Sequence, residues 1–210
     1  RVTREKVILR EVGLFPGEPF DMTRVAQSEQ RLRNLNYFEW VRGYPDERTE
    51  NTADLVFEVQ EKPTGMLSFG ASFSSVDSLV GQIELTQGNF DLFNWPTFMG
   101  GGQRVKLSLR AGSKLSEYSL SFVEPWFLDR PLSLGLDAYL NRRTYSEYVV
   151  QRTGGSLSLS YPTRLGFNTE WRYRLERVAL DDVQATNLYT DVDGTTTFRF
   201  LEEETRYASS

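Results

Sequence analysis

Apolar and polar side chains alternate over several long segments after Pro63. In residues 104–111, Val105, Leu107, Leu109 and Ala111 alternate with Arg104, Lys106, Ser108 and Arg110. The same alternation recurs in residues 132–140 and 167–175. Because successive residues of a strand point to opposite faces, each segment predicts a strand with one apolar and one polar face. Segments of about ten alternating residues separated by turns are typical of a membrane-spanning β-barrel.

The region after Pro63 divides into seven such strands and the start of another. We expect strands near residues 64–73, 79–88, 103–111, 116–124, 132–142, 148–161 and 163–177, with an eighth beginning near Thr195. Polar turns alternate with connections rich in proline and aromatic residues, such as 89–102 and 124–131. A barrel has short turns at one end and longer loops at the other, so both kinds of connection fit this fold.

Residues 1–62 follow a different pattern, which predicts a small α+β module. Helical spacing indicates one helix over residues 3–12 and another that begins after Asp21, a favourable N-cap. Alternation then predicts a strand from Phe38, a turn at residues 44–46 and a strand over 54–60. So small a module would be marginally stable alone. We therefore expect a first strand to be missing before Arg1 and the sequence to belong to a longer chain.

The composition argues against several kinds of chemistry. The 210 residues include no Cys and no His, which excludes thiol nucleophiles, imidazole bases, disulfides and ordinary zinc sites. The net charge of −5 argues against nucleic acid as a partner. No apolar run approaches the roughly 20 residues of a membrane-spanning helix. We predict that the chain is not an enzyme and holds no cofactor and no metal.

Two short motifs resemble ligand sites but lack residues that such sites need. The three glycines at positions 100–102 are not followed by the Lys and Ser/Thr of a phosphate-binding loop. Residues 191–194 resemble a calcium loop, but its first and last ligand positions would be Tyr189 and Phe200. We expect a strand entry at the first motif and a solvated loop at the second.

Pairs of carboxylates could suggest glycoside hydrolysis, for example Glu170 with Glu176 or Asp181 with Asp182. In an alternating strand, however, Glu170, Glu176 and the two arginines between them share one face. We expect a mixed-charge wall there rather than a catalytic site, as in the polar interior of a barrel.

Several stretches, taken in their order and spacing, resemble the BamA family of outer-membrane protein assembly factors. Residues 6–11, 17–20, 28–32, 35–38 and 54–61 resemble the last POTRA domain of that family. Residues 69–70, 87–90 and 124–127 resemble its first barrel strands and turns. The chain departs from the family pattern in lacking the first POTRA strand and about half of the barrel strands. Its segment 89–102 is also longer and more aromatic than the corresponding turn.

The resemblance implies a mainly β chain: a partial antiparallel transmembrane β-barrel preceded by a small α+β POTRA module. Residues 1–62 would be the incomplete last POTRA domain, placed in the periplasm. Residues 63–210 would be the first seven or eight strands of an incomplete barrel in the outer membrane of a Gram-negative bacterium.

The same resemblance implies that the protein inserts β-barrel proteins into the outer membrane. Its partners would be nascent outer-membrane proteins, accessory assembly lipoproteins and the lipid bilayer. The first barrel strand would form one lip of a lateral gate, with gate residues Gly65, Leu67, Phe69, Gly70, Ala71 and Phe73. Of these, we expect the odd-numbered apolar residues from Leu67 to Phe73 to face lipid, opposite Ser68 and Ser72. Glycine weakens a strand, so this edge would unzip easily.

A second candidate site is a set of aromatic residues in the proline-rich connections: Phe90, Phe93, Trp95, Phe98, Trp126 and Phe127. They could form a stacking platform for single-stranded nucleic acid, but no basic groove accompanies them. Amphipathic rings prefer the membrane–water interface, so we predict that these residues form an interfacial girdle.

Three other functions are open on the sequence alone. The chain could belong to a related POTRA-barrel transporter that secretes a protein or remodels lipid. It could form a passive small barrel, in which the segment from Thr195 pairs with residues 64–73. It could also be a soluble β-rich binding protein, in which the charged strand face is simply solvated.

Overall fold

The structure is a computed structural model that describes residues 2–49, 52–146, 148–163, 167–181, 188–190, 196–198 and 205–209. The chain is mainly β and forms two compact units. The first unit comprises Arg1–Gly65 and Gln87–Arg104, and the second comprises Met66–Thr86 and Val105–Ser210. Within the described residues, no helix is both long and apolar enough to cross a membrane.

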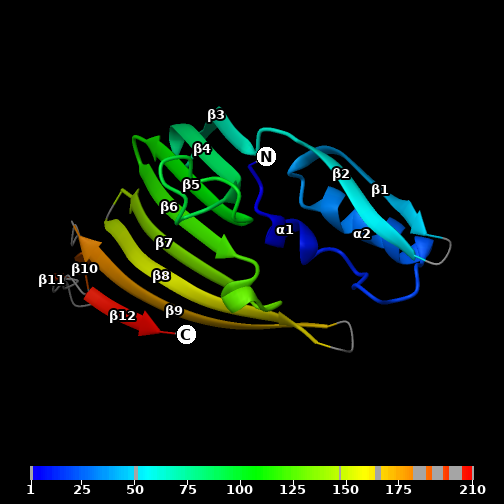
Figure 1. Cartoon of the computed structure of the whole chain (residues 1–210). Coiled ribbons are helices and arrows are strands. Elements are labelled where there is room, and N and C mark those ends of the chain that lie inside the picture. Colours follow the sequence, from blue (N-terminus) through cyan, green and yellow to red (C-terminus); the bar gives the residue numbers. More distant parts are fainter. Residues whose placement is uncertain are drawn as a thin grey trace. The chain divides into compact units, whose positions relative to one another are not determined.

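The first unit contains two helices and a β-hairpin. Helix α1 spans Glu5–Leu9, α2 spans Met22–Asn34, and strands β1 (Phe38–Thr49) and β2 (Thr52–Glu61) pair antiparallel. The Asp21 side chain accepts a hydrogen bond from the Thr23 amide at 2.8 Å, which confirms the predicted N-cap. Helix α2 lies against the hairpin, as Figure 1 shows. The apolar core consists of Val7, Ile8, Leu32, Tyr37, Phe38 and Val41.

Two details of the sequence prediction for this unit are wrong. The chain does not turn at residues 44–46, because β1 continues and Pro45 lies opposite Leu55. A two-stranded hairpin leaves one edge of each strand without a ladder partner, so the missing proline N–H is tolerated. The first helix is also shorter than the predicted 3–12, since it begins at Glu5 and ends at Leu9. The Gly13 amide instead donates to the Ser28 hydroxyl at 2.9 Å.

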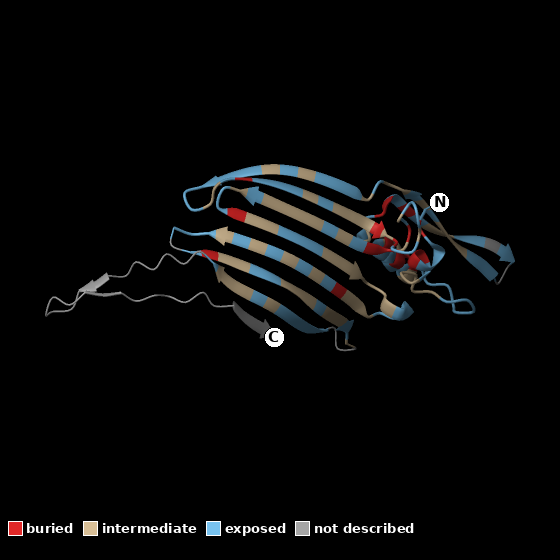
Figure 2. Cartoon of the chain, turned by 90° about the vertical axis from the view of Figure 1, so that its left-hand side faces the viewer, coloured by how far each residue is buried: buried red, intermediate tan, exposed pale blue. Residues whose placement is uncertain are grey.

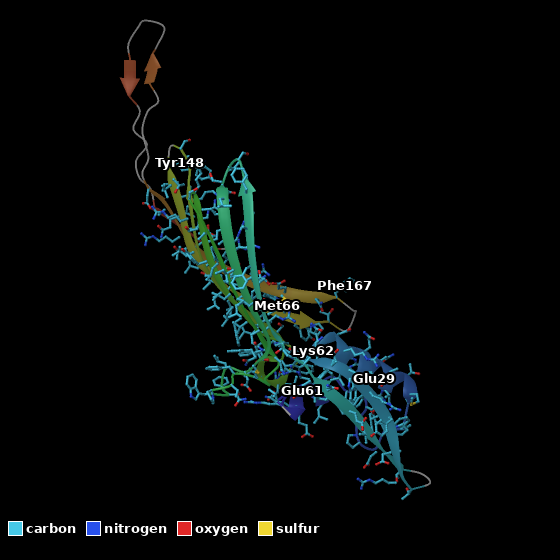
Figure 3. The ribbon with its side chains drawn as sticks, turned by 90° about the horizontal axis from the view of Figure 1, so that it is seen from above. Glu29, Glu61, Lys62, Met66, Tyr148 and Phe167 are labelled. Atoms are coloured by element: carbon cyan, nitrogen blue, oxygen red, sulfur yellow. The ribbon has the colours of Figure 1, made fainter. Side chains whose placement is uncertain are left out.

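Eight strands form one sheet that lies mostly in the second unit, with parts of β3, β4 and β5 in the first. They are β3 (Gly65–Ser74), β4 (Ser78–Phe90), β5 (Gln103–Gly112), β6 (Leu115–Glu124), β7 (Ser133–Thr144), β8 (Val149–Pro162), β9 (Asn168–Asp181) and β12 (Thr205–Ser209). Strands β3 to β9 are neighbours in chain order, and β12 pairs with β9 (Figure 1). Among the described strands the sheet is not closed, so β3 and β12 are its two edges. Tyr148 and Phe167 mark opposite ends of the strands (Figure 3).

Cross-strand pairing sorts the residues of β6 to β9 into two faces. Phe122, Leu136, Leu157 and Tyr173 lie in one row across four strands, and we call this side the apolar face. Ser121, Asp137, Ser156 and Arg174 form the adjacent row on the other side, the polar face. Figure 2 shows the alternation of exposure along these strands. The register confirms the predicted alternation of residues 132–140 and 167–175.

The last strands differ from the sequence prediction. Strand β9 begins at Asn168 rather than near residue 163. The segment near Thr195 does not join the sheet, since β11 (Thr196–Phe198) pairs with β10 (Leu188–Thr190) in a separate hairpin. The strand that pairs with β9 is β12, which starts ten residues further along the chain than predicted. Residues 191–194 and Asp182 lie outside the described residues.

Candidate functional site

Strand β3 contains all the predicted gate residues and occupies one edge of the sheet. Phe69 and Phe73 are 72% and 79% exposed, and Ser68 is half-buried. Gly70 faces Gln82 of β4, because a Cβ atom at Gly70 would lie 2.8 Å from the Gln82 amide nitrogen. This orientation puts the phenylalanines on the apolar face and Ser68 on the polar face. The gating role of these residues stays a prediction.

Side-chain pairs connect the polar face from β4 to β9. The Lys106 ammonium lies 3.0 Å from the Glu84 carboxylate, and the Arg110 guanidinium lies 2.6 Å from that of Glu117. Further along the sheet, the carboxylate of Asp137 accepts hydrogen bonds from the hydroxyls of two serines on the flanking strands. Strand β3 has no ionisable side chain and so forms no ion pair with its neighbour. The edge strand is therefore joined to β4 by its backbone ladder without ion pairs.

One side-chain hydrogen bond on the polar face spans an intervening strand, and a glycine in that strand leaves room for it. The Tyr139 hydroxyl of β7 donates to Glu176 of β9 across Gly154 of β8. A Cβ atom at Gly154 would lie 2.9 Å from the Tyr139 oxygen and 2.6 Å from the Leu175 carbonyl. An aromatic ring lying over a strand glycine is a known means of fixing strand register.

Replacing Gly154 with alanine is expected to displace Tyr139 and destabilise the sheet by about 1–3 kcal/mol, as overpacking does. Denaturant unfolding in detergent micelles measures the change. Gly81→Ala is the matched control, because its Cβ would meet only the Ala111 carbonyl at 3.8 Å, an ordinary contact. Equal stability of the two variants would mean that Gly154 does not support the Tyr139–Glu176 hydrogen bond.

The connection between β4 and β5 is fixed to the start of the chain by buried polar groups. We call this contact the turn dock; its residues are Thr3, Arg4, Tyr37, Asn89, Asp91, Gly100 and Gly102. The Asn89 amide donates to the Thr3 hydroxyl at 2.8 Å, and both residues are buried. The Arg4 amide donates to the Gly100 carbonyl at 2.9 Å. The Arg4 guanidinium lies 2.6 Å from the carboxylate of Asp91, which is 1% exposed.

Two glycines allow the close approach of backbones in the turn dock. Gly100 and Gly102 have φ angles of +103° and +80°, which side-chain-bearing residues rarely adopt. A Cβ at Gly100 would overlap the Val2 carbonyl oxygen. The Gly102 carbonyl accepts a hydrogen bond from the Tyr37 hydroxyl at 3.1 Å. Burial raises the pKa of Tyr37, which keeps the hydroxyl protonated as the donor.

Glu61, at the end of β2, holds the chain just before α1. Its carboxylate accepts hydrogen bonds from the Thr3 amide at 2.6 Å and the Val2 amide at 2.8 Å. Burial alone would raise the pKa of Glu61, but the hydrogen bonds from these residues offset it, and the net shift is downward. Figure 3 shows Glu61 beside Lys62, where the chain leaves the hairpin.

The lowered pKa of Glu61 predicts an acid-sensitive contact. A carboxyl with a lowered folded-state pKa contributes stability that is present above its ordinary pKa of 4.5 and is lost as the pH falls through the folded-state value. The protection factors of the Val2 and Thr3 amides, which compare measured with intrinsic exchange at each pH, should therefore fall in acid. In Glu61→Gln these protection factors should already be lower at neutral pH and should lose this acid dependence. An unchanged acid dependence in the variant would show that another group is responsible.

The structure brings together part of the predicted aromatic girdle. Phe90 and Phe98 stack with ring centroids 5.7 Å apart, and Trp95 meets Phe98 edge-on at 5.2 Å. Phe93 and Trp95 are 83% and 78% exposed in the same turn. The remaining two, Trp126 and Phe127, are half-buried in the connection between β6 and β7, which belongs to the second unit. The interfacial role of all six residues stays a prediction.

Sequence reasoning missed the turn dock. Residues 100–102 were expected only to enter a strand, and neither Asn89 nor Asp91 belongs to a predicted site. The glycine run was nevertheless a usable signal, because glycines mark positions where another backbone approaches closely. The division of the chain at residue 62 stays a prediction; the first compact unit includes residues 87–104 as well.

Comparison with known families assigns both parts of the chain. Residues 1–62 match the POTRA family model, described as a surface antigen variable number repeat. Residues 97–208, more than half of the chain, match the Omp85 superfamily domain. The chain belongs to the Omp85 superfamily.

Relatives of this Omp85 chain are similar over most of its length. A protein of Treponema pallidum, provisionally called an outer membrane protein assembly factor, is 32% identical over 165 residues, which are 77% of the chain and 19% of that protein. The outer membrane protein assembly factor BamA of Nitratidesulfovibrio vulgaris is 27% identical over 183 residues, which are 86% of the chain and 22% of BamA. The chain thus spans about a fifth of these relatives.

A solved structure supports the fold. The crystal structure of BamA from Haemophilus ducreyi lacking POTRA domains 1–3 superposes with a TM-score of 0.73 and 19% sequence identity. The match covers 100% of this chain and 40% of the BamA chain. The fold is therefore that of a POTRA module followed by part of an Omp85 barrel sheet.

Proposed function

We propose that this Omp85 chain takes part in the folding and insertion of β-barrel proteins into the outer membrane of a Gram-negative bacterium. The assembly factors among its relatives support this function. The observation that carries the proposal is the position of β3, an edge strand that directly follows the POTRA module. The second unit would lie in the membrane, with the POTRA module in the periplasm.

Strand addition at β3 is the proposed mechanism. An edge strand presents unpaired N–H and C=O groups, and an incoming strand can pair with them. Each added backbone hydrogen bond contributes about 1 kcal/mol net, so a strand of ordinary length would bind through many small increments. Because β3 has no ionisable side chain, separating it breaks no ion pair. It would therefore act as the movable lip of a lateral gate.

The POTRA module supplies a second edge in the proposal. Among the described strands, β1 pairs only with β2, so one side of β1 has no ladder partner. A nascent outer-membrane protein or an accessory assembly lipoprotein could add a strand there. The exposed Phe93 and Trp95 would rest at the membrane–water interface, where aromatic rings are favoured. Pairing of strands needs no cofactor, metal or covalent catalysis, so we propose none.

Disulfide trapping tests strand addition at β3. Ala71 of β3 and Ala138 of β7 both lie on the apolar face, but only Ala71 is on an edge strand. Each is replaced by cysteine in this cysteine-free chain in detergent micelles. An unfolded outer-membrane β-barrel protein with one cysteine in its last strand is then added under mild oxidation. We expect a mixed disulfide with Ala71→Cys and little with Ala138→Cys. Equal yields for the two variants would refute strand addition at this edge.

A further inference from the structure

The apolar face of β6 to β9 carries arginines at one end only. The rows of Leu136 and Ala138 of β7 contain no charged residue on the four strands. The next row on each side contains one: Glu124 in the row of Leu134, and Arg177 in the row of Leu140. Arg142 of β7 lies one row beyond, opposite Gln151, and Arg177 of β9 lies opposite Thr153. Both arginines are exposed. This end of the strands is the one away from the entry of the chain into β3.

Arg177 lines a cavity on the apolar face, and Arg142 lies opposite Gln151, another residue of its lining. The cavity has a volume of about 250 Å³ and is lined by Gln151, Thr153, Arg177, Ala179 and Asp181. Arg142 and Arg177 are two strands apart and offset by one row, which separates their Cα atoms by roughly 12 Å. Two extended arginine side chains can reach a common ligand over that distance. Gln151 and Thr153 lie between them and add an amide and a hydroxyl as hydrogen-bond donors.

We propose that Arg142 and Arg177, with Gln151 and Thr153 between them, bind phosphate groups of lipid headgroups in the outer leaflet of the membrane. The inference rests on the proposed membrane location. Guanidinium groups bind phosphate through paired hydrogen bonds, and a long side chain can keep its charge at the headgroup level while its stem covers apolar surface. Asp181 lies one row beyond Arg142 and Gln151, toward the end of the strands. Its carboxylate limits how far an anion can extend in that direction.

These two arginines differ from other arginines of β8 and β9 in the face of the sheet that they occupy. Arg152 of β8 and Arg174 of β9 lie on the polar face, opposite Asn141 and Ser156. They face away from any lipid that covers the apolar face. The double variant Arg152→Gln/Arg174→Gln therefore removes the same charge without touching the proposed site.

Vesicle flotation tests the inference with the whole chain. Binding is compared between phosphatidylcholine vesicles and the same vesicles containing bis-phosphorylated lipid A. Lipid A is expected to strengthen binding of the unsubstituted chain by about ten- to thirtyfold, given that each arginine near an anionic surface contributes roughly fivefold. Arg142→Gln/Arg177→Gln should lose most of this increase. The lysine double variant at the same positions should keep a large part, and the polar-face control should keep all of it.

The possible results separate this inference from the proposed function. Binding that is equal with and without lipid A, or an increase that the polar-face control loses as fully as Arg142→Gln/Arg177→Gln, would overturn the lipid-phosphate site alone. Removal of the lipid A effect by inorganic phosphate would indicate a site for a free anion, which also overturns the inference. Failure to bind either kind of vesicle would overturn the membrane location and the lipid site with it.

Discussion

Replacing Gly100 with alanine should disrupt the turn dock and destabilise the first unit by about 3–5 kcal/mol. Two effects add in this estimate: strain at a φ of +103° and overpacking of a filled site. The added methyl group would overlap the Val2 carbonyl oxygen, a backbone atom that cannot rotate away. Denaturant unfolding measures the loss. Exchange of the Arg4 amide, which donates to the Gly100 carbonyl, reports whether the dock itself has opened.

Gly17→Ala separates the two effects. Gly17 also has a positive φ, +88°, but nothing lies within 4 Å of the position that its Cβ would occupy. This variant should cost only about 1 kcal/mol, from backbone strain alone. A similar loss in both variants would mean that the close approach of Gly100 to Val2 contributes nothing to stability.

Removing the guanidinium of Arg4 should be the next most damaging change, at about 2–3 kcal/mol. Loss of one partner of a buried ion pair costs about 3–5 kcal/mol, and the 44% exposure of the Arg4 side chain reduces that figure. The Asp91 carboxylate oxygen that faces Arg4 has no hydrogen-bond partner among the described residues, so Arg4→Ala would leave it buried and uncompensated. Thermal or denaturant unfolding of the variant measures the effect.

Arg48→Ala is the control for Arg4→Ala. The Arg48 guanidinium lies 2.6 Å from Asp54, the same distance as in the Arg4–Asp91 pair, but the two side chains are 72% and 52% exposed. Exposed pairs contribute about 0–1 kcal/mol, so this variant should be nearly neutral. If the two variants lost the same stability, burial of Asp91 would not be what gives the pair its importance.

Much of the sheet could be predicted from the sequence, because side chains alternate between the two faces of a strand whatever the strand packs against. The alternation of residues 132–140 assigned each side chain to a face, and a one-residue error would have inverted all of them. The boundaries were less predictable, since they depend on partners elsewhere in the chain. Pro45 reads locally as a turn, yet the pairing of β1 with β2 keeps it in a strand. The segment near Thr195 reads as a strand but pairs within its own hairpin.

The candidate sites divide in the same way. The composition of β3 and the orientation of Phe69 and Phe73 follow from the local sequence. The turn dock does not, because its contacts join residues far apart in the chain: Thr3 and Asn89 are 86 positions apart. A periodic pattern within one segment cannot predict a contact between residues so far apart. What the sequence does contain is the glycine pair Gly100 and Gly102, whose meaning depends on the backbone that they meet.

The central claim, that the apolar face of the sheet lies against lipid, is tested most directly by tryptophan quenching. The chain has four tryptophans, so two single-tryptophan versions can be made by replacing the others with phenylalanine. One keeps Trp171, which is 75% exposed on the apolar face, and the other keeps Trp40, which is 44% exposed in β1 of the POTRA module. In vesicles of lipids brominated on the acyl chains, we expect strong quenching of Trp171 and little of Trp40. If Trp171 were quenched no more than Trp40, the apolar face would not be in the membrane.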